Sequence, residues 1–163
     1  MAVTIVSDVF HLVHLVFAAV WAGSVFYVAF VLLPLARDGA FTSTKPLEVA
    51  SGKLKTISRV SSVVLLATGG HLAGDRYTIG SSGGQDLFAS TNGQLVLVML
   101  VLWLALAGLI EVGAKRFEAG LDGKKLREPA RETLPLFRAA ALVAIALFVV
   151  GGLITTGTAV RYL

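Results

Sequence analysis

Four apolar stretches alternate with polar stretches along this 163-residue chain. Three of them are long and strongly apolar: residues 9–35, 95–113 and 136–158. A helix needs roughly 20 apolar residues to cross about 30 Å of hydrocarbon, and these stretches fit that length. The remaining stretch, 57–73, is shorter and more polar, which suits a helix packed inside a bundle. The pattern therefore predicts four transmembrane helices.

The polar connections between these stretches are short enough to place consecutive helices side by side and antiparallel. The predicted fold is an all-α integral membrane protein, an antiparallel four-transmembrane-helix bundle that forms one domain over residues 1–163. Composition agrees with this class. Hydrophobic residues make up 56% of the chain and charged residues only 15%, against about 45–50% and about 25% in ordinary soluble domains.

The distribution of charge predicts the orientation. Nearly all of the 14 lysines and arginines lie in or beside the predicted loops 36–56 and 114–135; Arg76 and Arg161 are the exceptions. The positive-inside rule places these two loops in the cytoplasm, with both termini and the Gly/Ser-rich loop 74–94 on the outer side. This asymmetry accounts for the pI of about 9.7 without a nucleic-acid partner. We expect a multi-pass protein in the lipid bilayer of the cell membrane.

The length and flanking residues of the first apolar stretch do not fit a cleaved signal peptide. The preceding segment MAVTIVSD contains no lysine or arginine. A secretory signal has a basic start and an apolar region of only about 7–15 residues. We therefore expect a retained helix. The chain has no cysteine, which excludes disulfides, thiolate zinc sites and iron–sulfur clusters.

Histidines supply the candidate chemistry. His11 and His14 are three residues apart and share one helix face. In the predicted topology, His71 near the end of the second helix and Met99 in the third lie at a similar depth in the outer leaflet. An ionisable side chain within a span is a functional-site hypothesis by default. Imidazole suits copper, zinc, iron and nickel, and thioether favours Cu(I), so these four residues are the predicted metal ligands.

Two alternatives stay open for the histidines. His14 and His71 could be the axial ligands of a haem b that moves electrons within the membrane. Each histidine could instead be structural, hydrogen-bonded to a hydroxyl or a carbonyl in a scaffold without catalytic function.

Near the cytoplasmic boundary, Arg59 and Glu111 are predicted to form a structural ion pair; otherwise Glu111 would belong to a cation or proton exit path. The sequence has no Ser/His/Asp arrangement, paired carboxylates or nucleotide fingerprint, so a role other than an enzyme is favoured.

Four pieces of the chain resemble the membrane domain of the CopD family of copper-resistance proteins. These are His14 with Trp21-Ala22-Gly23 and Pro34, similar to an H…W-x-G…P helix; Arg59-Val60-Ser61 with Thr68-Gly69, similar to R-F-S…T-G; Asn92-Gly93 before a long apolar helix; and Arg131-Glu132 before the last helix. The resemblance covers most of the chain. It implies that copper is bound at the outer face or passes inward, with an extracytoplasmic copper donor protein as partner and self-association as an option.

The chain also departs from that family. Val60 stands where the family usually has Phe, and a lysine common in its third helix is absent, with Met99 nearby. The four-helix HemJ-like protoporphyrinogen oxidases, which bind haem through a histidine of the first helix, are more distant. Their first-helix Tyr-His and third-helix lysine are both missing here. Copper handling is therefore favoured over oxidase activity.

Overall fold

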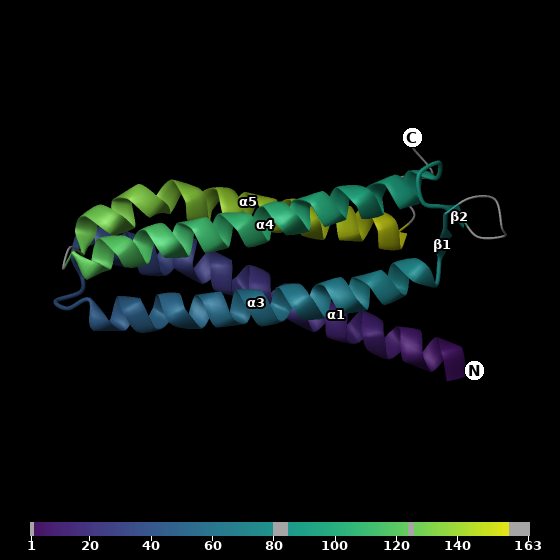
Figure 1. Ribbon diagram of the computed structural model, residues 1–163, viewed down its shortest axis with the longest axis horizontal. Coiled ribbons are helices and arrows are strands. Elements are labelled where there is room, and N and C mark those ends of the chain that lie inside the picture. Colours follow the sequence, from purple (N-terminus) through teal and green to yellow (C-terminus); the bar gives the residue numbers. More distant parts are fainter. Residues whose placement is uncertain (1, 80–84, 124–125, 157–163) are drawn as a thin grey trace.

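The computed structural model describes residues 2–79, 85–123 and 126–156. Its helices run back and forth along one axis (Figure 1). They are α1 (Ala2–Tyr27), which continues through the π-helical turn η1 (Val28–Leu32) into α2 (Leu33–Asp38), then α3 (Lys45–Gly74), α4 (Thr91–Asp122) and α5 (Arg127–Thr156). Strand β1 (Tyr77–Thr78) pairs in parallel with β2 (Gln85–Asp86) between α3 and α4. The described residues are thus almost entirely helical, as the sequence predicts.

Three helical segments are long and apolar enough to cross a membrane: Ile5–Asp38, Thr91–Asp122 and Arg127–Thr156. Helix α3 is not among them, because even its more apolar part, residues 57–73, carries Arg59, His71 and several serines and glycines. The run 80–84 and the end of the fourth predicted stretch beyond residue 156, with Arg161, lie outside the described residues.

The connections are much shorter than the sequence predicts. Residues 39–44 join α2 to α3, and residues 123–126 separate α4 from α5, in place of predicted loops over 36–56 and 114–135. The helices extend past the predicted membrane spans, because those spans were ended where the unbroken apolar run stopped. The charged segments continue as amphipathic helices whose apolar positions face the bundle.

Proline explains the break between α1 and α2. Pro34 lacks an amide hydrogen, and its ring crowds the carbonyl four residues earlier. The chain accommodates it with the five-residue π-turn η1, which widens the helix just before the proline. Helix α2 then ends at Gly39, whose φ of 86° is left-handed, a conformation that glycine adopts without steric cost. The chain can therefore turn sharply into α3.

The buried core occupies one end of the bundle, beside the connections 39–44 and 123–126. Apart from Gly93, the buried residues fall within 21–36, 47–68, 106–121 and 129–144, whereas none is buried in 5–20, 69–79, 94–105 or 145–156. We call these two regions the packed end and the open end. At the open end α1 diverges from α4 and α5 (Figure 1). The described start of α1 and end of α5 both lie at this open end.

The contrast between the ends follows from what drives burial. The packed end carries most of the charged side chains, and in water apolar side chains there gain free energy only by contacting one another. The open end is apolar, and such a surface is compatible with contact to lipid tails, which solvate apolar side chains as well as a protein core does. Its large hydrophobic residues are exposed, among them Leu12, Val16, Val101, Phe148 and Val149.

Helices α4 and α5 approach each other closely at two glycines, which have no side chain to keep the helices apart. A Cβ on Gly113 would lie 3.0 Å from the ring of Phe137, and one on Gly120 would clash with Pro129. Small residues at such crossings allow helix backbones to come near each other. This pair therefore forms a tight wall of the packed end.

Candidate functional site

Helices α1 and α3 meet along a line of polar contacts that we call the α1/α3 seam. The buried residues of α3 recur at alternating intervals of four and three: Leu47, Ser51, Leu54, Ser58, Ser61, Leu65 and Thr68. This spacing keeps one stripe of a helix against its antiparallel neighbour. Four of the seven buried residues are hydroxyl side chains, so the stripe carries hydrogen-bonding groups into the bundle.

Three hydrogen bonds along the seam join α1 to its antiparallel neighbour α3. Ser7 donates a hydrogen bond to Asp75 (2.6 Å), His14 is bonded to Thr68 (2.8 Å), and the buried Trp21 indole donates to Ser58 (2.9 Å). The three α1 members are seven residues apart, which returns the same face of the helix to α3 after two turns.

The bond between His14 and Thr68 defines the state of the imidazole. The Thr68 hydroxyl donates its only hydrogen to the carbonyl of Val64, at 2.7 Å in the same helix. Thr68 Oγ1 can therefore only accept from His14 Nδ1, 2.8 Å away. Nδ1 thus carries a hydrogen, and in the uncharged ring Nε2 is left with a free lone pair. A ring fixed through Nδ1 in this way is the usual arrangement of a metal-binding histidine.

His71 lies one turn further along the seam toward the open end. Its ring packs on Phe10 of α1, with the ring centroids 4.2 Å apart. Its Nε2 is buried without a hydrogen-bond partner; the nearest carboxylate oxygen, of Asp75, is 3.6 Å away. That separation is too long for a hydrogen bond. His71 therefore has an unsatisfied nitrogen beside an acidic side chain.

The structure places the four predicted metal ligands on two different interfaces. His11, His14 and His71 are half-buried; the latter two lie on the α1/α3 seam, and His11 is on α1 one turn from His14. Met99 lies on α4 and faces α5, with its methyl carbon 3.5 Å from where a Cβ on Gly151 would sit. Within the described ranges, no three His, Asp or Glu side chains come together closely enough to hold a metal ion.

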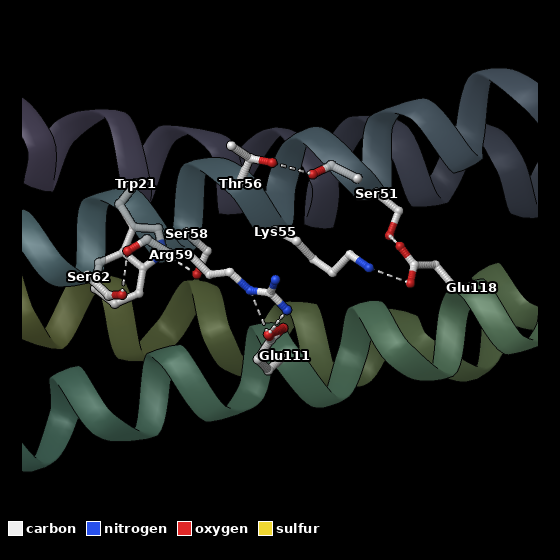
Figure 2. Close-up of polar contacts among 10 residues, drawn as sticks. Trp21, Ser51, Lys55, Thr56, Ser58, Arg59, Ser62, Glu111 and Glu118 are labelled. Atoms are coloured by element: carbon white, nitrogen blue, oxygen red, sulfur yellow. Dashed lines mark hydrogen bonds and ion pairs between the residues drawn. The ribbon is translucent and has the colours of Figure 1, made fainter.

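A second set of polar contacts joins α3 to α4 nearer the packed end (Figure 2). Arg59 Nε lies 3.0 Å from Glu111 Oε1, which is the ion pair expected from the sequence. One to two turns further on, Lys55 lies 2.6 Å from Glu118, which also accepts a hydrogen bond from Ser51 at 3.0 Å. Figure 2 shows both acids reaching from α4 toward α3. The first pair is the more exposed: 68% for Arg59 and 47% for Glu111.

Two residues of the seam have roles that the sequence did not reveal. In the sequence, Thr68 and Trp21 stood out only as parts of the motifs similar to those of the CopD family. Thr68 instead orients His14, and Trp21 pairs with Ser58. The available signal was that Ser58, Ser61 and Thr68 are three and seven residues apart and therefore share one face of α3.

Comparison with known proteins does not add to this picture. No protein-family model matches the chain, and no curated protein or solved structure matches it either.

Proposed function

We propose that this chain is a polytopic membrane protein that binds copper as its cargo at the open end of the α1/α3 seam. His14 is the principal ligand, with His11 and His71 as its partners. The observation that supports this assignment is the hydrogen-bond relay from His14 through Thr68 to the Val64 carbonyl. That relay leaves Nε2 of an uncharged His14 as a lone-pair donor, and imidazole nitrogen is a suitable ligand for copper.

The partners follow from position. His11 is on the same helix three residues before His14, which puts it on the same face. His71 is three residues beyond Thr68 in α3, about 4.5 Å further along the helix axis, and its Nε2 has no hydrogen-bond partner. Because no three-ligand group is preassembled in the described residues, copper capture needs rotation of one or both of these rings toward His14. Met99 is assigned no role, since it faces α5.

The orientation in the membrane is part of the same proposal. We place four helices across the bilayer, with the termini and the open end outside and the connections 39–44 and 123–126 in the cytoplasm. The positive-inside rule supports this, since the packed end carries the lysines and arginines. Helix α3 is the least apolar of the four. Its polar stripe faces α1, and Val60, Val63 and Leu66 are exposed on its other side, as a lipid-facing surface requires.

Copper binding is tested by titrating the purified protein with Cu(I) in competition with a chromogenic chelator. His14→Ala is expected to weaken binding at least tenfold. Thr68→Val is also expected to weaken it, because loss of an outer-shell partner typically costs about 10–100-fold in metal affinity. Met99→Leu is the matched control on the α4/α5 interface and leaves the affinity unchanged. Unchanged affinity in His14→Ala overturns the assignment.

An ultraviolet–visible spectrum of the same preparation distinguishes the haem alternative. A Soret band that disappears in both His14→Ala and His71→Ala would replace copper by haem b.

Orientation is tested separately, by single cysteines in this cysteine-free chain. Ser43→Cys and Ala89→Cys are both exposed. In intact cells, a membrane-impermeant maleimide is expected to label Ala89→Cys and to spare Ser43→Cys; the reverse pattern would contradict the orientation.

A further inference from the structure

Three arginines converge on one cavity at the packed end of the bundle. The cavity has a volume of about 610 Å³, is open to the surface, and is lined by Arg37 of α2 and by Arg127, Glu128 and Arg131 of α5. Arg127 and Arg131 are four residues apart and share one face of α5. Two helices that are distant in sequence thus contribute guanidinium groups to the same space.

The local chain geometry supports this convergence. The Arg127 guanidinium packs directly on Gly39, where the left-handed turn after α2 leaves no side chain in the way. Arg37 donates to Asp38 from Nε at 2.8 Å and from Nη2 at 3.3 Å, which leaves its other terminal nitrogen, Nη1, free to donate. Arg131 forms no hydrogen bond or ion pair within the described part of the chain. Glu128, the one acid that lines the cavity, has an interaction of its own.

We propose that Arg37, Arg127 and Arg131 form a binding site for a phosphate group. Planar guanidinium groups bind phosphate through paired, charge-assisted hydrogen bonds. The start of α5 adds to the attraction, since the amide groups at a helix N-terminus carry partial positive charge. Each of these features points toward an anion with several oxygen acceptors.

The depth of the site suits a phospholipid headgroup. Arg37 lies just past Leu35, where the first apolar stretch ends, and Arg131 lies five residues before Leu136, where the last one begins. Five residues of helix span about 7.5 Å. The polar headgroup layer adds roughly 5–8 Å on each side of the hydrocarbon. These two arginines therefore flank the depth at which lipid phosphates lie, whichever face of the membrane holds the packed end.

The test is native mass spectrometry of the full chain released from phosphatidylcholine-containing micelles during titration with phosphatidylglycerol. We expect at least one phosphatidylglycerol to remain bound. Arg127→Gln/Arg131→Gln is expected to weaken its binding about tenfold, in line with the loss of charge-assisted hydrogen bonds. The control Lys115→Gln/Arg116→Gln removes the same two charges from exposed positions of α4 and is expected to change binding less than twofold.

Inorganic phosphate distinguishes the two sources of the ligand. Competition by millimolar phosphate in the wild-type chain assigns the site to a free phosphate, and lipid retention without competition assigns it to a headgroup. Equal weakening in both double variants, or no weakening in Arg127→Gln/Arg131→Gln, overturns the proposal, because net charge alone would then explain any binding. The single variant Arg131→Gln leaves the contact between Arg127 and Gly39 intact. It keeps the test valid if the double variant fails to fold.

Discussion

His14 and Thr68 are joined by a hydrogen bond whose direction is set by a third group, the carbonyl of Val64. Because the Thr68 hydroxyl has already donated its hydrogen to that carbonyl at 2.7 Å, it can only accept from His14 Nδ1. One threonine thus links two helices and selects the tautomer of the imidazole. The lone pair on Nε2 then becomes available at the open end of the bundle.

Replacing Thr68 with Val is expected to remove this selection. Interhelical hydrogen bonds in membrane proteins contribute about 0.6 kcal/mol on average and up to about 1.7 kcal/mol. We expect the free energy of unfolding to fall within that range, and the nitrogen NMR spectrum of His14 to change from one tautomer to a mixture. The control is Thr56→Val, because Thr56 is exposed and bonds only to Gly52 of its own helix. A single unchanged tautomer in Thr68→Val would contradict the relay.

The neighbouring glycines of α3 provide a matched pair. A Cβ on Gly69 would lie 3.1 Å from His14 Cε1, whereas a Cβ on Gly70 would meet nothing within 4 Å. Replacing glycine with alanine inside a helix adds up to about 1 kcal/mol of stability when space allows. Gly70→Ala is therefore expected to stabilise the protein in reversible unfolding. Gly69→Ala is expected to gain less or to lose stability, and to weaken Cu(I) binding by moving His14. Equal effects of the two substitutions would show that His14 does not contact Gly69.

Trp21 and Ser58 are expected to be energetically coupled. Their hydrogen bond of 2.9 Å is buried, and such bonds contribute about 1 kcal/mol net. A double-mutant cycle of Trp21→Phe and Ser58→Ala, measured by unfolding, is expected to give a coupling energy of about that size. The control cycle combines Trp103→Phe with Ser58→Ala, because the indole nitrogen of Trp103 has no hydrogen-bond partner. Coupling between Trp103 and Ser58 equal to that of Trp21 would show that the indole bond is not its source.

The two α3/α4 ion pairs are expected to differ in their contribution to stability. Glu118 is 30% exposed and accepts from both Lys55 and Ser51, whereas Glu111 is 47% exposed and binds an arginine that is 68% exposed. Exposed ion pairs contribute only about 0–1 kcal/mol because water screens them. Glu118→Gln is therefore expected to reduce the free energy of unfolding more than Glu111→Gln does. The opposite order would indicate that the Arg59–Glu111 pair lies in a drier environment than its exposure suggests.

Hydrophobic patterning alone was enough to predict a helical chain and to locate three helices that are apolar enough to cross a membrane, because a run of about 20 apolar residues fits few other structures. It also identified Arg59 and Glu111 as an ion pair, since a charged side chain within an apolar helix usually pairs with an opposite charge. Hydrophobic patterning did not predict where the helices begin and end. Lys45 to Thr56 is too polar to stand out as a span, yet it is helical because Leu47 and Leu54 are buried against other helices.

The histidine environment was decided by tertiary structure alone. Depth along a helix can be counted from the sequence, and on that basis His11, His14, His71 and Met99 formed one group. The rotation of each helix about its own axis cannot be counted in the same way, because it depends on how all the side chains pack. That rotation turns Met99 toward Gly151 and His14 toward Thr68. The sequence therefore predicted which polar residues share a depth, and packing between helices determined which of them touch.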